Sequence, residues 1–391
     1  MRSPAITSSD PASIEPGALT LTELEALRGP HPDEFRPDFG APMRFEGLPE
    51  PGRILVSLPG WVGDVVMATP ALRALRQRFP GAHLTAHGKR HLLTLLEGSP
   101  LVDEVVPAPA RGARALLTAA RDLRVMHHDW CVLLAESERA ALLARLAGIP
   151  LRAGLFHTAP RRWLLSHPVP RVRSAGGRLA RFSMIERYLH LTRALGAPDD
   201  GDRMELSVLD RARESVDERL AAAGLEPGGP LVVVVPGAAF GAAKAWLPDR
   251  FGAAARELGA HLGARVVLAP GPGEERLASE VMGHAGLVGV SLDAPCLDLA
   301  ELTALIDRAT LVLTNDTGPR SIAVARRRPT VVVAGPTDQA YTAHHREDQR
   351  VLAADVPCRP CHRGVCPIDH RCMAGVSVAE VVRAALELVE G

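Results

Sequence analysis

Short apolar runs alternate with helix-like segments through most of this sequence, and the whole pattern occurs twice. Four runs typical of buried strands lie in the first half, at 54–58, 83–87, 102–106 and 130–135, and four in the second, at 231–235, 265–269, 311–314 and 330–334. Strand–helix alternation of this kind builds a parallel sheet with helices on both faces. Because 391 residues exceed one ordinary core, we predict an α/β protein with two parallel sheets, each in its own domain.

Breaks in this alternation predict the domain boundaries. Residues 1–50 contain eight prolines and one helix-like stretch at 19–27, so we treat them as an N-terminal extension. A first domain is predicted over 51–225 and a second over 226–375, with a long helical stretch at about 177–224 between the sheets. The linker is expected at 196–201 or at 226–230, where Gly and Pro gather. Residues 376–391 predict an amphipathic helix that packs back across the first domain.

Charge and hydropathy exclude two classes of protein. Lys+Arg and Asp+Glu number 45 each, which argues against a surface built to coat nucleic acid. No stretch approaches the roughly 18 apolar residues that span a bilayer, and the N-terminus lacks a basic stretch followed by a long apolar one. We therefore expect the protein to stay in the cytoplasm.

The loops after two predicted strands carry residues suited to chemistry. Ligands of open α/β sheets bind outside the carboxyl ends of the strands. The loop after 54–58 contains Gly63, which permits close backbone approach, and Asp64, which either caps the next helix or projects into a cleft. The loop after 231–235 carries Lys244 among small residues without the order of a phosphate-binding loop. This lysine either pairs with a diphosphate or is exposed to solvent.

Two further loops of the second half are also polar at a predicted helix start. Glu274 and Glu275 either accept hydrogen bonds from a ribose or favour the positive end of the following helix. The run Asp316-Thr317-Gly318 offers backbone N–H groups and a hydroxyl at a helix N-terminus, which suits an anion. A carboxylate beside a phosphate is unfavourable, so Asp316 is expected to orient the loop or to bind a sugar hydroxyl.

Four of the six cysteines gather near the C-terminus, with spacing typical of metal ligands. Four thiolates could form a tetrahedral structural zinc site, whereas a reducing cytoplasm disfavours disulfides. A structural metal, free thiols and disulfides all remain open for this cluster of Cys358, Cys361, Cys366 and Cys372, near which His362 and His370 are spare donors.

An ordered set of motifs carries a resemblance to a known family. The motifs are GWVGDVVMATPALRALRQRFP (60–80), PGAAFGAAKAW (236–246), LTNDTGPRSIAVA (313–325), GPTD (335–338) and CRPCHRGVCPIDHRCM (358–373). From about residue 53 onward the chain resembles glycosyltransferase family 9, the heptosyltransferases of lipopolysaccharide synthesis. The resemblance implies a GT-B architecture, in which two Rossmann-like domains face a cleft. It also implies that the first domain binds the acceptor and the second binds ADP-heptose.

The resemblance assigns roles to the polar loops. It implies that Asp64 is the catalytic base and that Lys244 belongs to the donor site. Asp316, Thr317 and Gly318 correspond to the donor loop of the family, and Glu274 is preferred over Glu275 as the donor-site glutamate.

One position departs from the family pattern. Where the family commonly has histidine in the helix after this loop, the chain has Ser321, and the neighbouring Arg320 is the candidate for replacing a lost phosphate contact. Transfer with inversion would then need no divalent ion or other cofactor, because Lys244 and backbone donors stabilise the leaving diphosphate. Any zinc would be structural.

An arginine-rich segment is the candidate acceptor surface. Residues 152–187 contain eight arginines and one acidic residue, and Arg161, Arg162 and Arg178 are the predicted contacts to an anionic glycolipid. The alternative is a solvated face with arginines paired elsewhere. Peripheral contact with the inner face of the cytoplasmic membrane is compatible with such an acceptor. Two other functions stay open, a nucleotide-sugar epimerase of the same fold and a nucleotide-sugar-binding relative without transfer activity.

Overall fold

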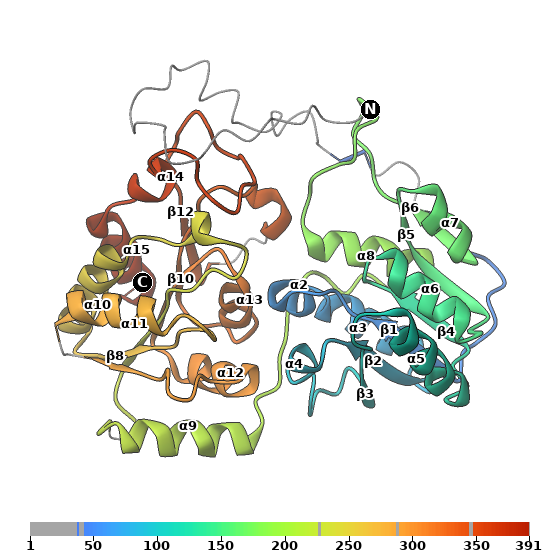
Figure 1. Ribbon diagram of the computed structural model, residues 1–391, viewed down its shortest axis with the longest axis horizontal. Helices are drawn as coiled ribbons and strands as arrows, with labels where there is room; N and C mark the ends of the chain where they lie inside the picture. Colours follow the sequence, from blue (N-terminus) through green and yellow to red (C-terminus); the bar gives the residue numbers. More distant parts are fainter. Residues whose placement is uncertain (1–36, 39–42, 226–227, 287–288, 344–346, 391) are drawn as a thin grey trace.

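The computed structural model of the chain describes residues 37–38, 43–225, 228–286, 289–343 and 347–390, and these form two lobes side by side (Figure 1). The helix predicted at 19–27 lies outside the described residues. Each lobe contains a six-stranded sheet in which all paired strands are parallel, and this confirms the predicted fold class. None of the described helices is long and apolar enough to cross a membrane.

The first sheet has the strand order β3-β2-β1-β4-β5-β6. Successive residues of β1 serve two cores: Ile54 and Val56 pack toward α2, α3 and α8, whereas Leu55 packs toward α5 and α6. Helices therefore cover both faces, as the alternation predicts. The elements of this lobe are β1 (Arg53–Ser57), α2 (Val62–Met67), α3 (Thr69–Arg78), β2 (His83–Gly88), α4 (Arg90–Leu93), β3 (Glu104–Pro107), α5 (Ala113–Val125), β4 (Trp130–Leu133), α6 (Glu138–Leu146), β5 (Leu151–Phe156), α7 (Ala159–Leu164), β6 (His167–Pro170) and α8 (Met184–Ala194).

The second sheet repeats this arrangement with the order β12-β11-β10-β7-β8-β9. β1 and β4 are neighbours in the first sheet, and β7 and β10 are neighbours in the second. The strand order reverses at each of these pairs, and open α/β sheets bind ligands at such a position. The elements are β7 (Leu231–Val235), η3 (Ala242–Lys244), α10 (Pro248–Leu262), β8 (Arg265–Leu268), α11 (Glu275–Ala285), β9 (Gly289–Ser291), α12 (Leu299–Arg308), β10 (Leu311–Asn315), α13 (Gly318–Ala325), β11 (Thr330–Val333), η4 (Gln339–Thr342), β12 (Gln349–Leu352), α14 (Arg371–Ala374) and α15 (Val378–Glu390).

The C-terminal helix α15 packs on the second lobe, and the prediction that it crosses the first lobe is wrong. Its buried residues Val381, Val382 and Ala385 belong to the core that contains Val232 and Val234 of β7. The helix contacts α10, β11 and β12. The amphipathic pattern correctly predicts a helix here. The pattern of a single helix does not indicate which of the two sheets its apolar side packs against.

The chain passes between the lobes through residues 195–209. α9 (Asp210–Ala222) packs against α12 of the second lobe, so the passage is complete before Asp210 rather than at 225. The predicted linker at 196–201 lies within this segment. Figure 1 shows α9 below the second lobe, at the end of the segment that enters it.

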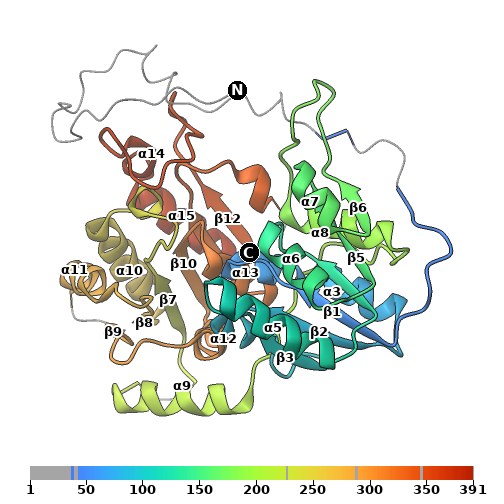
Figure 2. The same cartoon turned by 45° about the vertical axis from the view of Figure 1, so that its right-hand side comes forward.

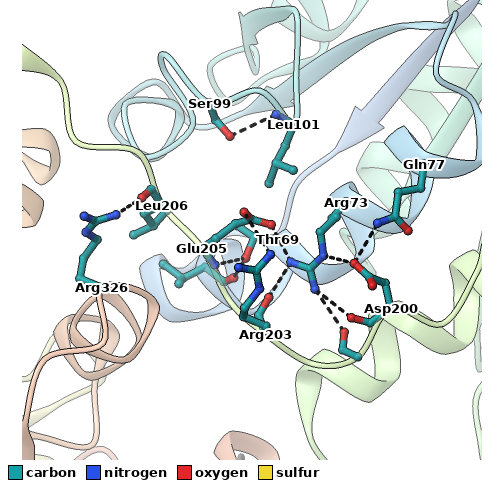
Figure 3. A network of polar contacts seen from close by, with 12 residues as sticks. Thr69, Arg73, Gln77, Ser99, Leu101, Asp200, Arg203, Glu205, Leu206 and Arg326 are labelled. Atoms are coloured by element: carbon teal, nitrogen blue, oxygen red, sulfur yellow. Dashed lines mark hydrogen bonds and ion pairs between the residues drawn. The ribbon is translucent and has the colours of Figure 1, made fainter. Parts of the chain in front are cut away.

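Two arginines, one from each lobe, hold the crossing segment (Figure 3). Arg73 of α3 donates to Asp200 Oδ2 at 2.7 Å, to Glu205 Oε1 at 2.6 Å and to the Arg203 carbonyl at 2.8 Å. From the second lobe, Arg326 donates to the Leu206 carbonyl at 2.5 Å. The middle of the segment, residues 200–206, is therefore held to both lobes by buried or half-buried donors.

We expect Arg73→Ala to lower the free energy of unfolding by about 1–3 kcal/mol. The substitution removes a buried guanidinium from two carboxylates and a carbonyl, and water can replace it only in part because these acceptors are half-exposed. Urea unfolding of both proteins measures the difference. Arg78→Ala is the control: its ion pair with Glu50 is exposed, and such pairs contribute about 0–1 kcal/mol. Equal destabilisation by the two variants would contradict the role given to Arg73.

Candidate active site between the lobes

Two cavities meet at the carboxyl ends of the two sheets. The interlobe cavity, of about 340 Å³, is lined from the first lobe by Trp61, Gly63 and Asp64 and from the second by loops after β7, β8 and β10. The first-lobe cavity, of about 690 Å³, lies at the ends of β1, β2 and β4. Asp64 lines both cavities. A ligand in either cavity would therefore meet this carboxylate.

Two glycines allow the lobes to approach at this point. A Cβ atom on Gly318 would lie 2.6 Å from the Cβ of Val62, and one on Gly63 would lie 3.2 Å from the Ser321 hydroxyl. Helices α2 and α13 consequently contact each other at their N-terminal ends, and both views show the two helices together (Figures 1 and 2). Any larger residue at 318 would push the two halves of the interlobe cavity apart.

Asp64 is a partly buried carboxylate without a partner among the described residues. It lies in the first turn of α2, where Trp61 is the N-cap and no side chain caps the helix, so the helix-cap interpretation is wrong. Among the described residues it accepts no hydrogen bond and forms no ion pair. Burial raises the pKa of Asp64 to about 6; the Arg187 cation opposes this shift, Glu136 adds to it and Lys244 opposes it. Such a group is ionised at neutral pH and is basic enough to accept a proton.

Lys244 faces Asp64 from the second lobe. Its side chain is 11% exposed, and its Nζ lies 3.8 Å from Asp316 Oδ2 and 5.7 Å from the Phe240 ring centroid. The solvent-exposed interpretation of this lysine is therefore wrong. Burial lowers the pKa of the ammonium, and the Asp316 carboxylate opposes that shift. The result is a cation with unused donors directed at the interlobe cavity.

Asp316 organises the second lobe's side of the cavity. It is 3% exposed, and its Oδ1 accepts a hydrogen bond from Arg320 Nη1 at 2.7 Å. Burial raises the pKa of Asp316, but Arg320 and Lys244 outweigh that effect, and the pKa lies below its ordinary value. Thr317 and Gly318, which follow it, line the interlobe cavity as predicted for this loop.

The structure corrects the expectation for Arg320. This side chain is buried and does not line the interlobe cavity; it donates to Asp316, to Thr342 Oγ1 at 2.9 Å and to Gln349 Oε1 at 3.2 Å. Its guanidinium is therefore used within the second lobe and does not replace a phosphate contact. Ser321 does line the cavity, opposite Gly63.

Glu274 is the glutamate that reaches the cavity. Its oxygens accept hydrogen bonds from Gly271 N at 2.7 Å and Ala238 N at 3.1 Å, so it joins the loops after β7 and β8. A Cβ on Gly237 would lie 1.9 Å from Glu274 Oε2, which shows how closely the backbone approaches this carboxylate. The Glu275 carboxylate accepts a hydrogen bond from Gly273 N at 3.1 Å and does not line the cavity, in agreement with the preference for Glu274.

Asn315 is a site residue whose role the sequence analysis did not recognise. Its Nδ2 donates to the Pro236 carbonyl at 2.7 Å, and its Oδ1 accepts from Trp246 N at 2.9 Å. The loop that carries Lys244 is thus held at both ends by one buried amide. An asparagine at the end of a buried strand indicates such a role, since the donors and acceptors of a buried amide side chain are usually hydrogen-bonded to neighbouring groups.

The predicted acceptor arginines are not brought together. Arg161 is fully buried and donates to the carbonyls of Ala135, Ser137 and Leu155, so it fixes the ends of β4 and β5 and cannot meet a ligand. Arg162 and Arg178 are exposed and line neither cavity. The cations that do line the first-lobe cavity are Lys89, Arg139 and Arg187.

The four C-terminal cysteines line one small cavity of about 20 Å³ together with Ala243 of the Lys244 loop. All four are free thiols, and among the described residues no group of three or more His, Cys, Asp or Glu side chains is arranged to hold a metal ion. Burial and the neighbouring cysteines raise the pKa of Cys372 to about 11. The side chains as placed do not fit a zinc site, and metal analysis of protein purified without chelators tests the prediction of one.

The cysteine segment, residues 358–373, contacts the backbone of the loop that carries Lys244. Ala243 N donates to the Gly364 carbonyl at 3.0 Å, and the His370 ring lies 2.9 Å from the Ala243 carbonyl. The same segment reaches the loop after β11, because Arg359 donates to the Gly335 carbonyl at 2.7 Å. Its described contacts are therefore structural.

Comparisons with known proteins agree with the geometry. The family described as glycosyltransferase family 9 (heptosyltransferase) matches residues 116–371. Lipopolysaccharide heptosyltransferase 2 of Escherichia coli K12 is 28% identical over 316 residues, covering 77% of this chain and 87% of that protein.

Two solved structures share the fold. The E. coli ADP-heptose lipopolysaccharide heptosyltransferase II superimposes with a TM-score of 0.71 and 24% identity, covering 86% of this chain and 98% of that one. A family 9 glycosyltransferase from Veillonella parvula gives a TM-score of 0.76 and 22% identity, covering 89% and 99%.

Proposed function

The chain belongs to glycosyltransferase family 9, the heptosyltransferases, and we propose that Asp64 and Lys244 are the groups with which it transfers heptose. The proposed donor is ADP-heptose, and the proposed acceptor is a hydroxyl of the lipopolysaccharide inner core. The observation that carries this proposal is the unpaired Asp64 carboxylate at the junction of the two cavities, opposite the Lys244 ammonium.

The proposed reaction inverts the anomeric carbon. The acceptor hydroxyl enters from the first-lobe cavity, and Asp64 accepts its proton as the oxygen forms a bond to the anomeric carbon. The bond from that carbon to the diphosphate oxygen breaks on the opposite face, and ADP leaves with the electron pair. Lys244 and the backbone N–H of Gly318 stabilise the added negative charge, whereas the Thr317 N–H donates to the Asn315 carbonyl at 2.8 Å. Glu274, from the loops that it joins, is proposed to bind the nucleoside part of the donor.

A panel of nucleotide sugars tests the reaction. The purified chain is incubated with ADP- and UDP-sugars, with and without lipid-A-core acceptors, while nucleotide release and the anomeric configuration of the product are followed. Release of ADP from ADP-heptose that depends on acceptor, with inversion, is expected. Conversion of the donor without acceptor would instead indicate an epimerase, and donor binding without turnover would indicate a relative that has lost transfer.

The acceptor is proposed to occupy the first-lobe cavity rather than the arginine surface. Lys89 and Arg139 lie on its wall, and positive charge there would attract an anionic glycolipid. We expect Arg139→Gln to raise the KM for acceptor about tenfold with little change in the KM for donor. Initial rates with each substrate varied in turn measure this.

The exposed arginines supply the matched control. Charge reversal at Arg162 and Arg178 together is expected to leave the acceptor KM within about twofold, since neither side chain lines the cavity. A large rise for this pair, with none for Arg139→Gln, would return the acceptor to the surface first predicted.

The location of the protein follows from this acceptor and belongs to the same proposal. A lipid-anchored acceptor places the reaction at the inner face of the cytoplasmic membrane, and contact with that surface is proposed to be peripheral. Cell fractionation with the chain followed in soluble and membrane fractions tests it, and release from the membrane by salt is expected for a charge-driven contact.

A further inference from the structure

One contact between the lobes involves Arg187, which lines the first-lobe cavity together with Asp64. Arg187 of α8 belongs to the first lobe, and its guanidinium carbon lies 5.6 Å from the ring centroid of Tyr341, which belongs to η4 of the second lobe. Nearby, Arg181 Nη1 lies 3.4 Å from Asp338 Oδ2 and also joins the lobes. A cation over an aromatic face is attractive, and more so when water is excluded.

Arg187 has donors that its neighbours do not use. It is 6% exposed, and its Nη1 lies 3.3 Å from Glu136 Oε1, whereas its Nε and Nη2 have no hydrogen-bond partner in the described part of the chain. Glu136 is shared with Arg171 at 3.5 Å, so one carboxylate serves two cations. A buried guanidinium with unused donors calls for a further anionic partner.

The first-lobe cavity contains that partner. Arg187, Tyr188 and Asp64 all line it, the Tyr188 hydroxyl also lacks a partner, and the Asp64 carboxylate accepts no hydrogen bond among the described residues. Unused donors and an unused acceptor therefore share one wall. The Arg187 cation is near enough to oppose the rise in the pKa of Asp64, and α8 contacts α2.

The position of Tyr341 depends on the second lobe's side of the site. Arg320 donates to Thr342 Oγ1 at 2.9 Å and to the Thr342 carbonyl at 3.2 Å, and so fixes η4. The same guanidinium bonds Asp316, which lies 3.8 Å from Lys244. A continuous series of polar contacts thus runs from the Lys244 ammonium to the segment that carries Tyr341.

We propose that Arg187 is a positioning residue for Asp64, and that Tyr341 completes its support only when the lobes are together. Phe182 of the first lobe lies at the same 5.6 Å from the guanidinium carbon, and Tyr341 adds the contact from the second lobe. This inference rests on the proposed transfer reaction. When the donor draws the lobes together, Tyr341 packs on Arg187, and Arg187 orients and stabilises the ionised Asp64 carboxylate. The base is then competent only in a cavity that is already closed around the donor.

The charges around Asp64 give this inference a directional test. The groups that face it are Arg187 and Tyr188 from α8, Glu136 from the loop after β4, and Lys244 from the second lobe. Loss of the Arg187 cation removes stabilisation of the ionised form, whereas loss of the Glu136 charge removes repulsion. The two substitutions should therefore move the acidic limb of the pH profile in opposite directions.

The experiment records kcat against pH and the KM for donor with the wild-type chain, Arg187→Met, Glu136→Gln, Tyr341→Ala and Tyr341→Phe. We expect the acidic limb to move up by about one pH unit in Arg187→Met and down in Glu136→Gln. Tyr341→Ala is expected to lower kcat about tenfold with the donor KM nearly unchanged. Tyr341→Phe keeps the ring and is expected to recover most of that loss.

Three outcomes overturn the inference. These are limbs that move in the same direction in Arg187→Met and Glu136→Gln, a Tyr341→Ala protein that turns over like wild type, and a Tyr341→Phe protein as slow as Tyr341→Ala. Donor binding measured by calorimetry shows whether each variant is folded. If the wild-type chain itself transfers no sugar, the proposed function fails, and that result is distinct from all three.

Discussion

Asp64→Asn lowers kcat by about 10²–10⁴ and leaves donor affinity nearly unchanged, because the amide keeps the shape of the side chain but cannot accept the acceptor's proton. Stopped assays at saturating donor and acceptor measure the loss, and calorimetry with the ADP-sugar measures binding. A purified Asp64→Asn protein with near-normal turnover would remove Asp64 from the mechanism.

The same variant is expected to be more stable than the wild-type chain at neutral pH. The pKa of Asp64 in the folded protein, about 6, lies above its ordinary value of 3.8. A carboxylate with a raised pKa favours the folded state while it is protonated, and that contribution is lost as the pH rises through about 4 to 6. At pH 7 the charge then opposes folding by up to about 3 kcal/mol, since one pKa unit corresponds to about 1.4 kcal/mol.

Thermal unfolding at pH 7 and at pH 4 tests this sign. A rise in Tm for Asp64→Asn at pH 7 that disappears at pH 4 is expected, together with wild-type turnover that increases as the pH rises through about 6. A variant that loses activity and stability together would point to misfolding instead of a missing base.

Lys244→Met is expected to lower kcat/KM for the donor by about 10²–10³, the effect of removing one preorganised charge from a developing anion. The cation is buried beside Asp316 and faces the interlobe cavity, so water cannot replace it fully. Kinetics with the donor concentration varied, and calorimetry with ADP alone, separate transition-state stabilisation from ground-state binding.

The composition provides a matched control, because Lys89 is the only other lysine in the sequence. It lines the first-lobe cavity, and its Nζ donates to the Gly60 carbonyl at 2.7 Å. Lys89→Met is expected to change the acceptor KM and to spare donor binding. If the two substitutions had the same effect on the donor, the assignment of the cavities would be wrong.

The sequence predicted the central strands of each sheet and also the edge strand β3, and it missed β5, β6, β9 and β12, which lie at or beside the other edges. The run at 231–235 is unbroken valine after Leu231, as expected of a strand buried on both faces. β5 was missed because Arg152 and Gly154 interrupt its apolar run, and β6 contains Pro168 and Pro170, which a sheet tolerates only at its edge. The helical segment that follows β1 forms two helices, α2 and α3, and Pro70 lies in the first turn of α3.

Site residues were predictable where they lie in a loop that follows a strand. They were unpredictable where the role of a side chain depends on hydrogen-bond partners from other segments of the chain. Asp64, Lys244, Glu274 and the 316–318 loop all lie on the interlobe cavity, because parallel strands deliver their carboxyl ends to one place. Arg161 could not be assigned, since its three acceptors come from separate segments. The bond from Arg320 to Asp316 was foreseeable from their spacing of four residues, which places Asp316 just before α13 and Arg320 in its first turn.

Support for the nucleotide side of the site comes from a part of the chain far downstream of it. Gly364 and His370 hold the backbone of Ala243, more than a hundred positions earlier, and Arg359 holds Gly335. A truncated protein ending near residue 355 would lose these contacts and also α15, whose buried residues complete the core of the second lobe. Damage to the four C-terminal thiols by alkylating or oxidising agents would accordingly resemble an active-site lesion, although none of these cysteines lines the interlobe cavity.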